Sequence, residues 1–131
     1  MPFNVSRTAQ FYDIEVMKYG VSLDGVPVKH GVLDATDSAS WTVSAGVRNV
    51  VPAGTIVKLS ATNTNQLVKY NGTGTIWGIL GHSTDLLAQS TSGDEPVPVY
   101  YHNVVFATSA IVGFTQYASA LISTLNTCKW E

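Results

Sequence analysis

The stretch from Pro52 to Leu80 most strongly constrains the fold of this 131-residue chain. Short runs rich in β-branched, aromatic and other apolar residues follow one another there, each bounded by Gly, Asn, Ser or Thr. Runs of this length between turn-forming residues are typical of strands, because a helix needs a longer uninterrupted segment. The sequence therefore predicts a β-meander, an antiparallel series of neighbouring strands. Its strands are expected at residues 55–59, 66–70 and 76–80.

The segment between the last two runs reads NGTGT, and two interpretations of its glycines compete. A phosphate-binding loop needs Lys-Ser or Lys-Thr after its second glycine, or the spacing G-x-G-x-x-G at the start of a helix. Here Gly72, Gly74 and Gly78 have the spacing G-x-G-x-x-x-G, and a strand-like segment follows. We therefore expect a structural hairpin bend of Asn71, Gly72 and Gly74, with positive φ at Asn71 and Gly72. Gly78, in mid-strand, is expected to mark a bulge or the close approach of another backbone.

The C-terminal part of the chain adds a strand and a helix. The β-prone residues 97–106 predict a long strand, and Pro96 and Pro98 place it at a sheet edge, because proline lacks a backbone N–H. Helical spacing of apolar residues then predicts one amphipathic helix at 114–126, packed on the sheet. The expected fold is mainly β with one C-terminal α-helix (α+β), with residues 10–131 as a single domain. The helix residues expected to face the sheet are Phe114, Tyr117, Ala118, Leu121, Ile122 and Leu125.

Residues 10–50 are less regular. Alternation in FYDIEVMK predicts a half-buried strand, and Asp24-Gly25 between two β-prone segments predicts a hairpin turn. Small and polar residues dominate from His30 to Asn49, which predicts a long loop. Trp41 is the one large anchor of this loop. Two interpretations of Trp41 remain open: an exposed partner-binding side chain, or a ring folded back onto the core of the domain.

The first nine residues, MPFNVSRTA, show no clear period and few large apolar groups. They predict an extended arm at 1–9 that becomes ordered on a partner. The same residues lack the basic start and the apolar stretch of a signal peptide. The mature protein is therefore expected to begin near residue 1 and to be made in a cytosol.

The charge content limits the classes of partner. Charged residues make up 12% of the chain, against about 25% in typical soluble proteins. Interface cores are depleted of charge, so this composition favours a protein that assembles with partners. The net charge of −2 offers no cationic surface for phosphate backbones, so nucleic-acid binding is not expected. No apolar run approaches the roughly 20 residues that span a bilayer, so no membrane contact is expected.

The chain shows no residue pattern that predicts catalysis, a metal or a cofactor. The segment Gly81–Asp85 (GHSTD) brings Ser, His and Asp together. Neighbours on one loop rarely form a catalytic triad, so a capped turn is expected there. A small hydrolase built around His82 and Asp85 remains the enzymatic alternative. The histidines, which are far apart in sequence and lack the short spacing of metal ligands, are His30, His82 and His102.

An ordered series of short motifs covers residues 50–106. A proline turn and a strand are followed by an apolar-basic strand with an aromatic residue, an Asn-Gly-Thr bend, and a strand with Gly-Ile-Leu. A polar loop with Asp and a strand with aromatic residues complete the series. These elements are Pro52, Leu67–Tyr70, Asn71-Gly72-Thr73, Gly78-Ile79-Leu80, Asp85 and Val99–Phe106. In this order and spacing they resemble the head decoration proteins of tailed bacteriophages, the capsid-cementing family of the phage lambda type.

The resemblance implies a short-stranded, barrel-like β fold and a structural, non-enzymatic protein of the virion. It implies homotrimers on the outer capsid surface, made in the host cytoplasm, that stabilise the head against internal DNA pressure. It also implies that the N-terminal arm extends onto the major capsid protein. The residues of that capsid-binding arm are Pro2, Phe3, Asn4, Val5, Ser6 and Arg7.

A second virion function is the alternative to capsid decoration. A head-fibre or tail structural protein that recognises host glycans would use aromatic faces to stack on sugars. The residues available for this are Trp41, Tyr100 and Tyr101.

Overall fold

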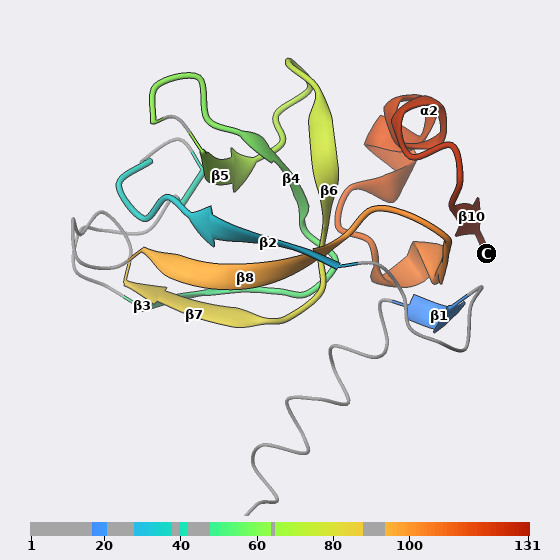
Figure 1. Cartoon of the computed structure of the whole chain (residues 1–131), viewed down its shortest axis with the longest axis horizontal. Coiled ribbons are helices and arrows are strands. Elements are labelled where there is room, and N and C mark those ends of the chain that lie inside the picture. The colour runs from blue at the N-terminus through green and yellow to red at the C-terminus, as the bar shows by residue number, and fades with distance from the viewer. Residues whose placement is uncertain (1–16, 21–27, 38–39, 42–47, 64, 88–93) are drawn as a thin grey trace, which may run out of the picture.

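The computed structural model describes residues 17–20, 28–37, 40–41, 48–63, 65–87 and 94–131 (Figure 1). The described chain is mainly β with one α-helix near the C-terminus, so the predicted fold class is confirmed. The predicted arm at 1–9, most of the FYDIEVMK strand and the Asp24-Gly25 turn lie outside the described residues. The strands are β1 (Met17–Gly20), β2 (Val28–Leu33), β3 (Arg48–Val51), β4 (Ile56–Leu59), β5 (Gln66–Lys69), β6 (Ile76–Leu80), β7 (Thr84–Leu87), β8 (Glu95–Tyr100), β9 (Val104–Phe106) and β10 (Lys129–Trp130). The helices are the 3₁₀ turn η1 (Thr108–Ala110) and α2 (Phe114–Thr124).

A closed barrel forms the centre of the molecule. Its five strands follow the order β2-β5-β4-β6-β8, and all neighbours are antiparallel except β2 and β5. Closure removes the unpaired edges that an open sheet of short strands would expose. Two small sheets flank it, β3–β7 and β1–β9–β10. In Figure 1, α2 lies beside β6 at one side of the barrel, with β10 and the C-terminus next to it.

The predicted meander is wrong in its pairing, although its strands are correct within one residue. β5 and β6 do not pair with each other; both pair with β4, from opposite sides. Lys69 of β5 and Gly78 of β6 both lie opposite Val57. The NGTGT segment therefore carries the chain across β4 rather than turning a hairpin. The consecutive strands that pair in this region are β4 and β5, which are antiparallel.

The predicted loop from His30 to Asn49 is partly wrong, because it contains most of β2 and the start of β3. β2 pairs with β8 along its whole length. On the other side, Gly31 lets β2 lie close to the Leu67 side chain of β5, because a Cβ atom at Gly31 would lie 2.5 Å from Cδ1 of Leu67. Pairing with a distant strand, which local sequence does not encode, thus orders this segment. The polar segment after His82 likewise contains a strand, β7, which pairs with β3.

The long strand predicted at 97–106 is two strands in different sheets, β8 in the barrel and β9 in the β1–β9–β10 sheet. The chain turns between them at Asn103, whose φ of 54° ends the extended conformation. β8 is also not an edge strand. The carbonyl of Pro98 accepts the N–H of Gly81, so the ring nitrogens of Pro96 and Pro98 face away from β2. The missing N–H groups therefore remove no bond between β2 and β8.

Two hydrophobic cores share the barrel wall. Neighbouring residues on β4 and β6 point to opposite faces: Val57 and Leu80 belong to the cluster inside the barrel, and Ile56 and Ile79 to the cluster under the helix. Strands buried on both faces are continuously apolar rather than alternating, which explains the run IWGIL. Trp41, Leu33, Leu67, Leu86, Val51, Val97, Val99 and Ala35 complete the first cluster, and Phe106, Val104, Tyr70, Ile76, Ile111, Leu121, Leu125 and Cys128 the second.

The helix lies within the predicted range and packs through Leu121 on the second core. It begins after Gly113, whose φ is 78°. The expected position of Ile122 on the buried face is wrong, because its side chain is 51% exposed. The buried contacts follow Tyr117, Leu121 and Leu125, which are four residues apart. Ile122 lies about 100° further around the helix and faces away from them.

Candidate interaction surfaces

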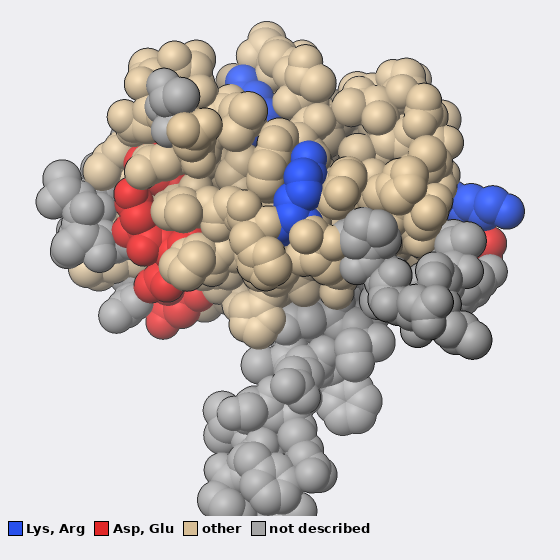
Figure 2. Space-filling model, in the orientation of Figure 1, with Lys and Arg blue, Asp and Glu red and all other residues tan. Residues whose placement is uncertain are grey.

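Charge is unevenly distributed on the described surface. Figure 2 shows acidic atoms gathered at the end of the barrel where β2 ends and β8 begins, while basic atoms appear as separate groups. Asp34, Asp94 and Glu95 come from that end. Asp94 accepts the N–H of Ala35 at 2.8 Å and the side-chain amide of Gln66 at 3.0 Å. These carboxylates therefore join the ends of barrel strands.

The predicted capsid-binding arm, Pro2 to Arg7, lies outside the described residues, so its role stays a prediction.

Trp41 is part of the barrel core, and the interpretation of Trp41 as an exposed partner anchor is wrong. Its side chain is 2% exposed and packs in the cluster that contains Leu33 and Leu86. The indole Nε1 donates to the backbone carbonyl of Asp34 at 2.6 Å. The alternative, a ring folded back onto the domain's own core, is confirmed. The small polar residues around Trp41 in the sequence gave no local sign of this packing.

Asp34 is a buried acidic residue that the sequence analysis did not identify. Its carboxylate accepts the backbone N–H of Thr36 at 3.0 Å and the Thr36 hydroxyl at 2.6 Å, and it also accepts the amide of Asn63. Burial alone would raise the pKa of Asp34, but these hydrogen bonds outweigh burial and lower it. The D-x-T spacing is the local signal that could have predicted this Asx turn.

The NGTGT segment is structural, but not all of its predicted conformation is correct. Gly72 and Gly74 have φ of 96° and 81°, so the expected left-handed glycine at Gly72 is confirmed. Asn71 is not at positive φ; its side-chain oxygen instead accepts the N–H and hydroxyl of Thr73, at 3.1 and 2.8 Å. Lys58 of β4 donates to the same oxygen at 2.9 Å and to the Thr73 carbonyl at 2.9 Å. The ammonium group thus fastens the segment to the strand that it crosses.

Both expectations for Gly78 are confirmed. The β4–β6 register shifts between Val57 and Lys58, opposite Gly78 and Ile76, as in a β-bulge. A Cβ atom on Gly78 would lie 2.7 Å from the carbonyl oxygen of Tyr100. The glycine therefore permits β6 and β8 to approach at the closure of the barrel.

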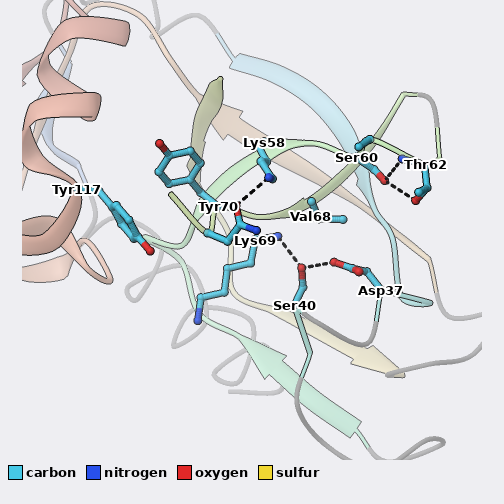
Figure 3. A pocket seen from close by; sticks show the side chains of 11 residues that line it. Asp37, Ser40, Lys58, Ser60, Thr62, Val68, Lys69, Tyr70 and Tyr117 are labelled. Carbon is cyan, nitrogen blue, oxygen red and sulfur yellow. Dashed lines mark hydrogen bonds between the residues drawn. The ribbon is translucent and has the colours of Figure 1, made fainter. Parts of the chain in front are cut away.

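A hollow of about 430 Å³ lies between the NGTGT segment and the turn that precedes Trp41 (Figure 3). Ser40 donates to Asp37 and accepts the backbone N–H of Lys69 at 3.0 Å. Tyr70 and Tyr117 lie at its other end, with ring centroids 4.9 Å apart in an edge-to-face contact. The Ser40 hydroxyl is thus bonded to a carboxylate and to a backbone N–H, and these bonds join the turn before Trp41 to β5.

The GHSTD segment forms the turn between β6 and β7. Ser83 accepts the backbone N–H of Ala53 at 2.9 Å, and the Thr84 hydroxyl donates to the carbonyl of His82 at 3.1 Å. These contacts hold a capped turn, as expected. Within the described ranges, no group of three or more His, Cys, Asp or Glu side chains is placed to hold a metal ion.

Two of the exposed apolar side chains among the described residues line the same hollow. Val50 of β3 is 64% exposed and Val112, before α2, is 42% exposed. Both line one hollow of about 160 Å³, together with Pro52. We call these three residues the Val50–Val112 patch. Apolar side chains beside one another at the surface are typical of contact sites between proteins.

The whole chain was compared with protein-family models, curated proteins and solved structures, and none of these comparisons found a match. A search of the described helices found none with the length and apolar character needed to cross a bilayer.

Proposed function

We propose that this chain is a capsid decoration protein of a tailed bacteriophage, which binds the major capsid protein on the outer surface of the head as a homotrimer and stabilises the head against internal DNA pressure. The observation that carries the proposal is the ordered motif series between Pro52 and Phe106, which resembles that family. In the fold, this series supplies β4, β5, β6 and β8, four of the five barrel strands. Most of the strand motifs thus lie in the barrel, whereas Asp85 lies in β7 and Val104–Phe106 form β9, in the two flanking sheets.

The surface supports assembly as the function. Charged residues are few, and the Val50–Val112 patch exposes apolar side chains outside both cores. Burying apolar surface is favourable at about 25 cal/mol per Å². The patch is therefore a candidate contact between copies of the chain.

Multivalency supplies the strength of capsid binding. A trimer carries three arms that reach three capsid sites. After the first arm binds, the second and third bind at high effective concentration, so that weak single contacts give stable attachment.

The glycan-binding alternative is not favoured by a specific observation. It depended on three aromatic faces, and Trp41 is in the barrel core. Tyr100 is partly buried against the second core, and its ring lies beside Gly81.

Binding to capsid shells tests the proposed function. Expanded shells of the phage that encodes the chain, assembled without decoration protein, are incubated with increasing protein and sedimented. We expect saturable binding with three copies at each local three-fold position. Unexpanded shells and shells already decorated are the controls, and both should bind less. Absence of saturable binding to expanded undecorated shells would overturn the proposal.

A further inference from the structure

Lys29 of β2 lies between two aromatic rings. Its ammonium nitrogen is 3.9 Å from the ring centroid of Trp77 and 4.5 Å from that of Tyr101. The same nitrogen donates to the backbone carbonyl of Trp77 at 3.0 Å. An ammonium group has three N–H donors. The aromatic faces attract its positive charge but do not act as hydrogen-bond acceptors of the carbonyl type. Two donors therefore remain for other acceptors.

No carboxylate neutralises this ammonium group among the described residues. Lys29 is opposite Val99 in the β2–β8 register, whereas Glu95 is opposite Leu33. Four residues of strand separate the two positions by about 13 Å, which exceeds the screening length of about 8 Å at physiological ionic strength. The acidic group in Figure 2 lies at that distant end. Burial lowers the pKa of Lys29.

A cavity of about 250 Å³ opens beside Lys29. The loop after α2 contributes Asn126 and Thr127 to its wall, and the turn after β8 contributes His102. The Thr127 hydroxyl and Nδ1 of His102 are 2.8 Å apart. Groups from the barrel and from the helical end of the chain thus converge on one small polar space, with Trp77 and Tyr101 on its wall.

We propose that this cavity, the Lys29 pocket, binds a carboxylate group. One carboxylate oxygen accepts from the Lys29 ammonium. The amide of Asn126 is a donor for the second oxygen, and so is the Thr127 hydroxyl in the tautomer in which Nδ1–H of His102 donates to that hydroxyl. A charge-assisted bond of this kind is about twice as strong as a neutral one, and the aromatic walls lower the local dielectric constant and strengthen it further. A single cation matches a singly charged acid. This inference does not depend on the capsid function.

Titration followed by amide and indole NMR shifts tests the proposal. The probes are acetate, N-acetylglutamate N-methylamide and glucuronate, with acetamide and glucose as neutral controls, at pH 7 and constant ionic strength. We expect saturable shifts at the Trp77 indole and the Thr127 amide with the acids only. Stronger binding of the glutamate derivative would indicate an acidic side chain of a protein as the source of the carboxylate, and stronger binding of glucuronate an acidic sugar.

Variants separate the pocket from general charge effects. Lys29→Gln should weaken acid binding at least about tenfold, which corresponds to about 1.4 kcal/mol. The matched control Lys129→Gln removes an exposed charge from β10 and should leave the affinity unchanged. Thr127→Val, which keeps Lys29 but removes one donor, should weaken acid binding about threefold. This variant serves as the test if Lys29→Gln does not fold. Equal shifts with acetate and acetamide would overturn the proposal. Wild-type affinity for the acids in folded Lys29→Gln, or in folded Thr127→Val if Lys29→Gln does not fold, would overturn it as well.

Discussion

Asp34 and Trp41 are joined through the turn that follows β2. The carboxylate of Asp34 orders the turn through Thr36 and Asn63, and its backbone carbonyl accepts the indole N–H. The turn thus satisfies the polar atom of a large ring that is otherwise surrounded by apolar side chains. Both residues act on stability, and the position of Trp41 in the core depends on this turn.

Asp34→Asn should destabilise the protein by about 1–3 kcal/mol at pH 7, because a charged acceptor of several hydrogen bonds is lost. The pKa of Asp34 is lowered in the folded state, below its ordinary value of about 3.9. Its contribution is therefore present above about pH 4 and is lost as the pH falls through the lowered folded pKa. Urea unfolding from pH 7 to pH 2 should show the stabilities of the two proteins converging in acid. A difference that stays constant with pH would contradict this account.

Gly78→Ala should cost more stability than Gly72→Ala. At Gly78 the added Cβ would lie 2.3 Å from Cγ1 of Val99 and 2.7 Å from the carbonyl of Tyr100, so barrel strands must separate. Overpacking of this kind costs about 1–3 kcal/mol. At Gly72 the nearest atom, on the Tyr117 ring, is 3.5 Å away, and the cost is the left-handed backbone alone, about 1 kcal/mol. Urea unfolding of both variants measures the order, and a smaller loss for Gly78→Ala would refute it.

At the scale of elements, local pattern was sufficient for the positions of β4, β5 and β6 but not for their partners. The runs at 55–59, 66–70 and 76–80 are strands, because turn residues delimit each run within a few positions. β5 and β6 both pair with β4, and Lys58 of β4 bonds to the NGTGT segment that joins them; no local pattern encodes this arrangement. β2 and β7 were missed for a related reason, since their order comes from distant strands.

For the candidate sites, too, local sequence predicts some features, and others depend on contacts between distant residues. The structural roles of Gly72 and Gly78 follow from local conformation and were predictable. The burial of Trp41 was left as one of two interpretations, because small polar neighbours give no periodicity. The Val50–Val112 patch and the Lys29 pocket each join residues that are more than forty positions apart, so only the fold brings them together.

Deletion of residues 2–9 should leave the fold intact and weaken binding to expanded shells. The barrel strands and both cores lie outside this segment. Nine residues with few apolar groups do not offset their own ordering entropy unless a partner adds contacts. We expect an unchanged melting temperature and about tenfold weaker binding, which corresponds to about 1.4 kcal/mol. The full-length double variant Phe3→Ser, Val5→Ser is the comparison, since it removes the large apolar groups of the arm without shortening the chain. Wild-type binding by the protein without residues 2–9 would show that the arm does not contribute to capsid binding.

At the scale of the whole molecule, the barrel is a rigid wall between two cores, and its outer surface carries few charges. The exposed Val50–Val112 patch is the contact with a second copy of the chain that we propose. In a homotrimer the contacts are head-to-tail, so the patch of one copy contacts a different surface of the next copy. Three such contacts close the ring.

Light scattering should therefore give a mass three times that of the 14.0 kDa chain at micromolar concentration. Val50→Asp should shift this mass toward the monomer, because a charge would be buried in the contact. Leu59→Asp, at another exposed apolar position, is the matched control and should remain trimeric. A trimer unaffected by Val50→Asp would place the contact elsewhere, and a monomeric wild type would limit trimers to the capsid surface.

The temperature at which filled heads release their DNA tests the central claim most directly. Heads of the encoding phage that lack decoration protein are heated with and without added protein, and released DNA is measured by dye fluorescence. Because a ligand that binds only the intact shell stabilises it by mass action, we predict that release shifts to higher temperature in proportion to occupancy and saturates with the binding curve. Stoichiometric binding without any shift in the release temperature would contradict a stabilising function.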